Sequence, residues 1–380
     1  MHRKVPWINL AIAAIASAYW LTSGVTLVHH AVHYNFLSFY SGASLARHGD
    51  FHHLYDLSIV SELQKRLLPD TGEPVPFTRP PMYAVMQAPL TLLSIVPAYG
   101  VYISLQIAAL FGCWALACRK FGADALVYCS LYLPSAYGLM HGQDNVWMLF
   151  ILIVAFSLAE SGMDIAAGTV LALGLIKFNL LLLFPFVLLL QKRWRMLFSF
   201  GVFGLAQASL SAILIGKTGL QQYRALLERK DLGVSPIEWT MLNVRALPQN
   251  LGSDSWWIVA PLGILVLGLA LAACWRAPLW RWFSAAAIGS LLVSPHVYKY
   301  DATMLLLPIL LAIFWSASRF TRIVAATAVT PIPYLVALLG QPFAAIPAVL
   351  LLTLLGALAR ESYDETRVAQ PASQPLLAAT

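Results

Sequence analysis

Residues 164–191 read DIAAGTVLALGLIKFNLLLLFPFVLLLQ, an apolar run that carries Lys177 and Asn179 near its middle. About 20 apolar residues in a helix cross a hydrocarbon core of roughly 30 Å, so this run is longer than one crossing needs. Two interpretations are open. The run forms one long membrane span, or it forms two half-helices broken near Lys177-Phe178-Asn179, which changes the topology of the segments that follow.

Similar apolar runs recur along the 380 residues, of which 59% are hydrophobic and 11% are charged, with a mean hydropathy of +0.73. This composition excludes a soluble globular protein of the ordinary type. In lipid every backbone polar group must be satisfied internally, which leaves helices or a closed barrel. The runs do not alternate polar and apolar residues as barrel strands do. We therefore predict an all-α polytopic membrane protein.

The net charge of +7 predicts membrane orientation and not nucleic-acid binding, because the basic residues gather in short loops between apolar runs. These clusters are Arg3/Lys4, Lys192/Arg193/Arg195, Arg276/Arg281 and Arg319/Arg322. The four cysteines all fall within predicted spans, where they are expected as small core residues and not as a disulfide framework or a metal site.

The basic clusters suggest a topology of about twelve spans when Arg3 and Lys4 are placed in the cytoplasm. The spans are expected near 7–28, 80–97, 98–118, 121–139, 144–160, 164–191, 196–215, 256–275, 280–295, 298–317, 322–338 and 342–359. The first run is too long for a signal-peptide core and is expected to stay as an uncleaved span. Both termini then lie inside, and Arg119/Lys120 is the basic pair that falls on the outer side. Residues 1–360 are expected as one domain, and 361–380 as a disordered cytoplasmic tail.

Two segments, 29–79 and 216–255, are too polar for lipid and are expected as outer loops. Within the first, apolar residues at helical spacing predict an interfacial amphipathic helix over 58–68. The sequence Thr78-Arg79-Pro80-Pro81 predicts a helix start, because proline is favoured in the first turn. Arg79 places a cation at the outer interface.

Lys177 is the clearest chemical candidate, because a charge among leucines at membrane depth is costly. A lysine there is a point charge suited to an anionic group such as a phosphate. The alternative is a side chain that reaches back to the membrane surface.

Two further polar clusters lie between apolar spans. Ser294–Asp301 has two interpretations. In the first, Lys299 and the tyrosine hydroxyls bind a phosphate or sugar hydroxyls, and Asp301 orients them. In the second, the segment is a polar hairpin with a Lys299–Asp301 pair. In His141–Asn145, the side chains bind substrate, or Asp144 and Asn145 cap a helix.

The nine histidines do not predict a metal site. His29 and His33 have the i, i+4 spacing of a metal pair, but no carboxylate or thiolate with firm ligand spacing accompanies them. A histidine acting as a general base is favoured over a histidine ligand. No cofactor is predicted.

The ordered set of motifs resembles glycosyltransferase family 87, the polyprenyl-phosphate-mannose-dependent mannosyltransferase-like group (DUF2029-type) with the GT-C membrane fold. The resemblance spans about residues 30–315. The motifs that carry it are Asn35-Phe36-Leu37-Ser38-Phe39-Tyr40, Leu54-Tyr55-Asp56, Pro80-Pro81 with Ala88-Pro89-Leu90, Gly142-Gln143, the Lys177 motif with Arg193-Trp194-Arg195, Asn243-Val244-Arg245, and Ser294-Pro295 with Tyr298 and Tyr300-Asp301.

The resemblance implies an inverting hexosyltransferase, with mannose as the expected sugar, in the cytoplasmic membrane of a bacterium with its active site on the outer side. The expected partners are a polyprenyl-phosphate-sugar donor, a glycolipid or polysaccharide acceptor, and the lipid bilayer. The donor phosphate is expected at Lys177, Lys299, Arg79 and Arg245. Substrate contacts are expected from Tyr40, His141, Gln143, Asp144, Asn179, His296, Tyr298, Tyr300 and Asp301.

Inversion needs a base that deprotonates the acceptor hydroxyl opposite the leaving group. In the family this base is an aspartate, and its position is matched by Asn35, whose amide cannot take a proton. Either a neighbour such as His33, Asp50 or Asp56 takes over, or the alignment points to the wrong acid, or the protein is slow or inactive and binds lipid-linked sugar without transferring it.

A function of another class is a transporter or flippase for a lipid-linked or polar solute, because charges at membrane depth also mark translocation paths. Transporters usually show repeated halves, which this sequence lacks. A transferase needs a sizeable outer loop beside the membrane, and residues 29–79 supply one. The sequence thus favours the transferase.

Overall fold

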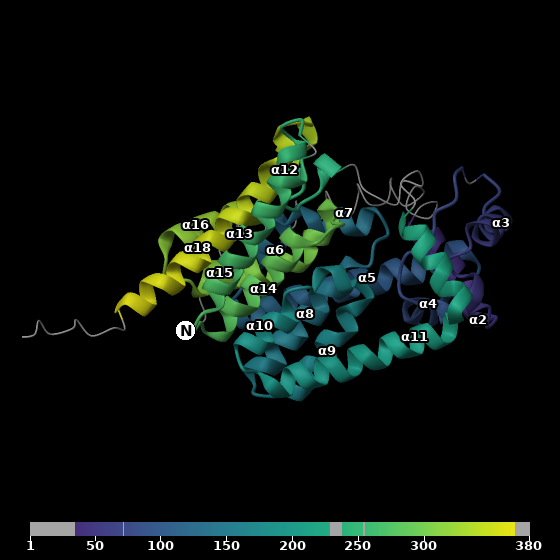
Figure 1. Ribbon diagram of the computed structural model, residues 1–380, viewed down its shortest axis with the longest axis horizontal. Coiled ribbons are helices and arrows are strands. Elements are labelled where there is room, and N and C mark those ends of the chain that lie inside the picture. The colour runs from purple at the N-terminus through teal and green to yellow at the C-terminus, as the bar shows by residue number, and fades with distance from the viewer. Residues whose placement is uncertain (1–34, 71, 229–237, 254, 369–380) are drawn as a thin grey trace, which may run out of the picture.

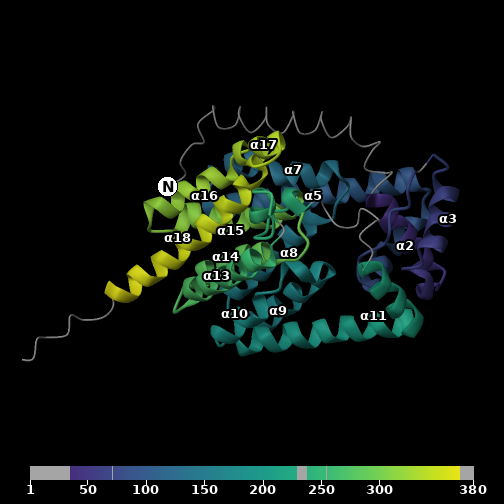
Figure 2. The same cartoon turned by 45° about the horizontal axis from the view of Figure 1, so that its top comes forward.

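The computed structural model describes residues 35–70, 72–228, 238–253 and 255–368, and all regular elements in these ranges are helices (Figures 1 and 2). The expected first span at 7–28 and His33 lie outside the described residues. The α-helices are α2 (Leu37–Arg47), α3 (Leu57–Leu67), α4 (Pro81–Gln87), α5 (Ile95–Phe121), α6 (Ala125–Leu131), α7 (Leu133–Met140), α8 (Asn145–Glu160), α9 (Asp164–Leu173), α10 (Phe184–Leu190), α11 (Trp194–Glu228), α12 (Ala246–Gln249), α13 (Trp256–Cys274), α14 (Leu279–Val293), α15 (Leu306–Trp315), α16 (Arg319–Val329), α17 (Ile332–Val336) and α18 (Ile346–Val368). The 3-10 helices are η2 (Phe51–His53), η3 (Ala88–Leu92), η4 (Gly174–Leu180), η5 (Glu238–Thr240), η6 (Lys299–Leu305), η7 (Ala337–Leu339) and η8 (Phe343–Ala345).

The long run at 164–191 is broken, which confirms the half-helix interpretation. Helix α9 passes into η4, where Lys177 leaves helical geometry with φ −126° and ψ 62°, and α10 then runs on to Leu190. The two ends of the run lie side by side, since Arg193 Nη1 is 3.2 Å from Asp164 Oδ1. The segment is therefore a helical hairpin whose tip is η4, and not one crossing.

Helix α5 corrects a second expectation. The predicted spans 80–97 and 98–118 are not separate, because one helix of 27 residues covers 95–121. Pro97 lies in its first turn, where a missing N–H costs little. The preceding segment forms the short α4 and η3, and α4 starts at Pro81 as the proline pair predicts.

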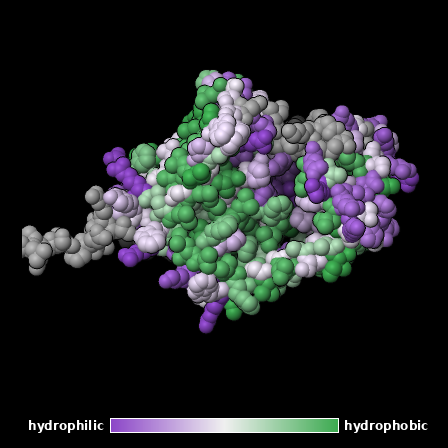
Figure 3. All heavy atoms as spheres, in the orientation of Figure 1, coloured by the Kyte–Doolittle hydropathy of each residue, from purple (hydrophilic) through white to green (hydrophobic). Residues whose placement is uncertain are grey.

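Four helices among the described residues are long and apolar enough to cross a membrane. They are Ile95–Phe121, Trp194–Glu228, Trp256–Cys274 and Phe343–Glu365. A fifth span results if Arg319–Val329 and Ile332–Leu339, bent by 54°, are counted together. On the face shown in Figure 3, hydrophobic side chains cover most of the middle of the molecule, whereas hydrophilic ones gather at the end that carries α2 and α3. The protein is thus a helical membrane protein, and the total of about twelve spans stays a prediction.

The basic clusters of the described chain gather at one end of the helices, which we call the basic end and define by Lys120, Arg193, Arg281 and Arg319. Lys120 pairs with Glu160 at the end of α8, and its Nζ lies 4.9 Å from the centre of the Trp315 ring at the end of α15. The expectation that Arg119/Lys120 faces the other side is therefore wrong. The topology predicted from the sequence is wrong there because it counts 80–97 as a crossing.

Helix α18 contacts the basic end, and its length corrects the expectation that residues 361–380 are disordered. It continues to Val368, so residues 361–368 are helical and not disordered, whereas 369–380 lie outside the described residues. Glu361 is buried and accepts hydrogen bonds from Ser316 Oγ at 2.6 Å and from the Ala317 amide at 2.9 Å. Arg281, also buried, pairs with Glu365.

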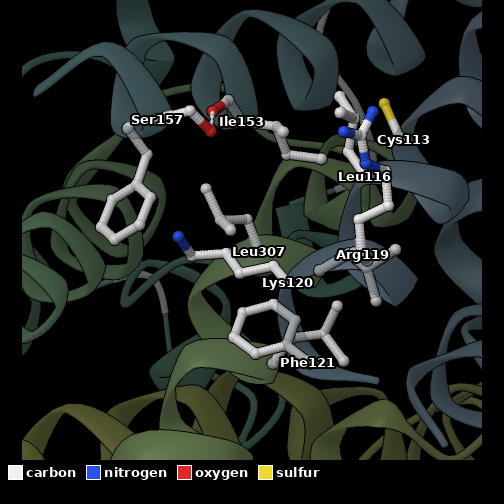
Figure 4. A pocket seen from close by; sticks show the side chains of 12 residues that line it. Cys113, Leu116, Arg119, Lys120, Phe121, Ile153, Ser157 and Leu307 are labelled. Atoms are coloured by element: carbon white, nitrogen blue, oxygen red, sulfur yellow. Dashed lines mark hydrogen bonds between the residues drawn. The ribbon is translucent and has the colours of Figure 1, made fainter. Parts of the chain in front are cut away.

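A cavity of 240 Å³ lies between α5, α8 and α15 near the basic end (Figure 4). Its lining is mostly apolar, with Arg119 and Lys120 at α5 and Ser157 at α8. Because it lies among helix ends at the basic end, it is separate from the polar residues described below.

The first polar segment is packed and helical over its described part. Helix α3 confirms the amphipathic helix predicted at 58–68, and Asp56 caps it by accepting from the amides of Ser58 and Ile59 at 3.0 and 3.4 Å. The second polar segment does not begin as a loop, since α11 continues to Glu228 after a kink at Gly216, which has φ 61°. Figures 1 and 2 show α11 running along the molecule to the end that carries α2 and α4.

Candidate active site

The candidate site lies where the hairpin tip η4 meets the starts of α8 and η6, away from the basic end. Lys177 is only 4% exposed, and its Nζ donates to Asp301 Oδ1 at 2.8 Å and lies 2.9 Å from Asp144 Oδ1. It also donates to Asn145 Oδ1. The non-helical backbone at Lys177 turns its side chain to these three oxygens, so the break in the helix builds the site.

Arg79 completes the arrangement from the segment before α4. Its Nε and Nη2 donate to the two carboxylate oxygens of Asp144, each at 2.9 Å, in a bidentate geometry that favours strong pairing. Nη2 also donates to Gln143 Oε1 at 3.2 Å. The Tyr55 hydroxyl donates to the Arg79 carbonyl at 2.8 Å and fixes the backbone. Arg79 Nη1 has no protein partner in the described chain.

We call Arg79, Asp144, Lys177 and Asp301 the charge cluster. It holds two cations and two carboxylates, so its formal charges cancel. Isolated charges removed from water are very costly, and pairing with close hydrogen bonds is what makes their burial tolerable.

Two local interpretations are wrong in view of this cluster. Asp144 lies at the N-cap of α8, but its side chain makes no capping hydrogen bond because it is turned to Arg79 and Lys177. Asp301 does not pair with Lys299, whose Nζ lies 3.5 Å from the Ala337 carbonyl. Asp301 Oδ2 accepts instead from the Tyr298 amide at 2.8 Å.

Aromatic rings surround the cluster. The Tyr300 ring lies 5.6 Å from Lys177 Nζ, stacks on Tyr298 at 4.9 Å, and has the His141 ring 5.9 Å away. His296 in turn lies 5.1 Å from the Tyr298 ring. Such faces suit the apolar face of a sugar ring as well as a cation.

Asn179 ties the hairpin tip to the 294–301 segment. Its Nδ2 donates to Ser294 Oγ at 3.0 Å and to the His296 carbonyl at 2.8 Å. Sequence reasoning did not single out Asn243, whose Nδ2 donates to the Ser294 carbonyl at 2.8 Å and holds the same segment from the other side. Its place in the Asn243-Val244-Arg245 motif was the available signal.

The side chain of Asn35 contacts the backbone of His141, next to the site. Its Nδ2 donates to the His141 carbonyl at 2.8 Å. The His141 ring lies 4.3 Å from the Tyr137 ring, and its Nδ1 is 2.9 Å from the Tyr137 carbonyl. Tyr40, from the same motif as Asn35, donates its hydroxyl to the Leu93 carbonyl at 2.7 Å, and within the described ranges no hydrogen bond joins it to the charge cluster.

The remaining predicted residues lie in other contacts. Asp50 Oδ1 is 2.6 Å from His53 Nδ1, and Asp56 caps α3 and accepts from Gln222 at 3.2 Å. Arg245 pairs with Glu238. In the described ranges no group of three or more His, Cys, Asp or Glu residues is arranged to hold a metal ion.

The model of glycosyltransferase family 87 matches residues 77–295. This segment covers more than half of the chain and contains Arg79, Asp144 and Lys177, while Asn35 and Asp301 lie outside it. Comparisons with curated proteins and with solved structures gave no match. The family match confirms the resemblance seen in the sequence and agrees with the apolar helices, so the chain belongs to glycosyltransferase family 87 and is a membrane glycosyltransferase.

Proposed function

We propose that this enzyme transfers a hexose from a polyprenyl-phosphate-sugar donor to a glycolipid or polysaccharide acceptor, with inversion at the anomeric carbon. Mannose is the first candidate for the hexose. The observation that carries the proposal is the charge cluster at the tip of a broken helical hairpin, within a protein whose helices present hydrophobic side chains over the middle of the face in Figure 3. A donor with a polyprenyl chain keeps that chain in hydrocarbon while its phosphate meets cations at the edge of the helices.

The donor phosphate needs a cation with N–H groups that the protein has not already engaged. Lys177 is held by two carboxylates and nearly fully buried, so its part is to hold Asp144 and Asp301 in place. The Arg79 side chain is 17% exposed and keeps Nη1 unpartnered in the described chain. Lys299 is half-buried and has only a backbone carbonyl at 3.5 Å. We therefore propose that Arg79 Nη1 and Lys299 Nζ donate hydrogen bonds to the phosphate of the sugar donor.

The proposed orientation follows from the basic end. Loops rich in lysine and arginine stay in the cytoplasm, so Lys120, Arg193, Arg281 and Arg319 favour a cytoplasmic basic end. The charge cluster lies at the other ends of α8 and of the α9–α10 hairpin. This supports an active site on the outer side of the cytoplasmic membrane of a bacterium, where the acceptor is met.

Transfer assays test the proposal directly. The purified protein, reconstituted in liposomes, is incubated with polyprenyl-phosphate-[14C]mannose and glycolipid acceptors, and label in the product is counted. We expect transfer by wild type, a donor KM at least tenfold higher in Arg79→Ala and Lys299→Ala, and no change in Lys217→Ala, an exposed lysine on α11. Solute uptake into the liposomes without any label transfer would refute the transferase and favour a transporter.

A further inference from the structure

We propose that His141 is the general base that takes the proton of the acceptor hydroxyl, and that Asn35 positions it. This inference rests on the proposed function, because it identifies the group that an inverting transfer requires at the acceptor side.

Asn35 is used in this protein as a hydrogen-bond donor. Its Nδ2 lies 2.8 Å from the His141 carbonyl oxygen, which only accepts. A carboxylate at this position would set one of its own oxygens against that carbonyl, with no proton between them. The amide therefore fits its surroundings and a carboxylate does not, so the base lies elsewhere.

The carboxylates near the site are poorly suited to the task. Asp144 and Asp301 are both buried and bound to Lys177, and Asp144 also accepts hydrogen bonds from Nε and Nη2 of Arg79. Cations that stabilise a carboxylate weaken it as a proton acceptor.

The carboxylates of the first polar segment are also occupied. Asp56 caps α3, and the hydrogen bond from the Ser58 hydroxyl, together with those from the Ser58 and Ile59 amides, holds its pKa below the ordinary range. Asp50 is bound to His53. Neither makes a contact with the charge cluster in the described residues.

The surroundings of His141 fix the form of its ring. Nδ1 lies 2.9 Å from the Tyr137 carbonyl, and a carbonyl can only accept, so Nδ1 carries the proton in the neutral ring. Nε2 then keeps its lone pair and has no protein partner in the described chain. Burial lowers the pKa of the half-buried ring, which favours this neutral form near pH 7.

The His141 ring lies beside the charge cluster. The centre of the Tyr300 ring is 5.9 Å from the centre of the His141 ring and 5.6 Å from Lys177 Nζ, so the imidazole and the cluster share one aromatic neighbour. Gln143, two residues beyond His141, is bonded to Arg79.

The proposed step is balanced. His141 Nε2 takes the proton of the acceptor hydroxyl while the hydroxyl oxygen forms a bond to the anomeric carbon of the donor sugar. The bond between that carbon and the phosphate oxygen breaks, and its electron pair leaves with the polyprenyl phosphate near Arg79 and Lys299. The imidazolium afterwards releases its proton to water.

The test compares initial rates of label transfer for wild type, His141→Ala, His141→Gln and His48→Ala between pH 5 and 8. His48 is a matched control, because its Nδ1 lies 2.8 Å from the Ser44 carbonyl one turn earlier but its ring is exposed. We expect kcat about 10²–10⁴-fold lower in both His141 variants with little change in donor KM, partial rescue of His141→Ala by free imidazole, and wild-type behaviour of His48→Ala. Wild-type kcat/KM should fall as pH drops through a single ionisation.

Asn35 variants give the second measurement. If His141 is the base, Asn35→Asp is expected to transfer at least tenfold more slowly than wild type. If the residue at position 35 were the base, the same substitution would restore the family carboxylate and speed transfer. The inference is overturned if wild type transfers and His141→Ala matches it, if Asn35→Asp is faster, or if His33→Ala and not His141→Ala removes the acidic limb of the profile. Absence of transfer by wild type itself would instead refute the proposed function.

Discussion

Replacing Lys177 with methionine tests whether the charge cluster holds the broken hairpin in place. The side chain of Lys177 bridges Asp144 at 2.9 Å and Asp301 at 2.8 Å, and both carboxylates are buried. In Lys177→Met, Asp144 keeps its bidentate contact with Arg79, but Asp301 keeps only the Tyr298 amide at 2.8 Å. The variant therefore leaves one buried carboxylate without a cation.

The expected cost follows from that uncompensated charge. Removing one partner of a buried ion pair typically destabilises a protein by about 3–5 kcal/mol. A change of 1 kcal/mol shifts the melting temperature of a large domain by roughly 2 °C, so we expect a fall on the order of 6–10 °C. Lys177→Met/Asp301→Asn removes the stranded charge, and we expect it to recover about half of this loss.

The assay is thermal unfolding of the detergent-solubilised protein, followed by tryptophan fluorescence. Asp301→Asn alone should cost less than Lys177→Met, since Lys177 retains Asp144 as a partner. Lys217→Met, at an exposed position of α11, is the matched control and should melt like wild type. The reasoning fails if Lys177→Met keeps the wild-type melting temperature, or if the double variant is as unstable as the sum of the single losses.

Two further predictions concern packing and capping. In Gly168→Ala the added Cβ would lie 2.2 Å from the Met196 carbonyl and from Ser199 Oγ, so α9 and α11 must separate; we expect a loss of about 1–3 kcal/mol in thermal unfolding. Gly112→Ala, with nothing within 4 Å, should be neutral or slightly stabilising, and equal melting of the two variants would contradict the close approach. In Asp56→Ala the loss of the α3 cap should cost about 1 kcal/mol at pH 7. Because the pKa of Asp56 is lowered in the folded state, this contribution is present above the unfolded pKa of about 3.9 and is lost as pH falls through the lower folded value. A pH-independent difference between Asp56→Ala and wild type would show that the carboxylate is not responsible.

The features that the sequence predicted well depend on neighbouring residues. Lys177 and Asn179 within a run longer than one crossing suggested a break in 164–191 as one of two interpretations, and Pro81 marked the start of α4. The helical spacing of apolar residues over 58–68 predicted α3. In each case the deciding interaction lies within a few turns of one helix, so a single segment holds enough information.

The partners within the charge cluster were beyond such reasoning. Asp144 lies 33 positions before Lys177, and Asp301 lies 124 positions after it. From the local sequence, a helix cap at Asp144 and a pair of Asp301 with Lys299 stood as alternatives to substrate binding, because those were the nearest groups of the right kind. Only the packing of η4 against α8 and η6 makes the longer-range pairs available.

The positions of the four charges also explain why the cluster belongs to breaks in the helices. Asp144 lies at the N-cap of α8 and Asp301 in the first turn of η6, where the helix dipole favours negative charge. Lys177 comes from a non-helical residue and Arg79 from the residue before the prolines that start α4. At Lys177 the backbone has φ −126° and ψ 62°, so a continuous helix over 164–191 would change this geometry and turn the side chain away from its present direction. The broken hairpin and the site therefore have one cause, and a substitution that restores a straight helix there should abolish donor binding along with the fold of the tip.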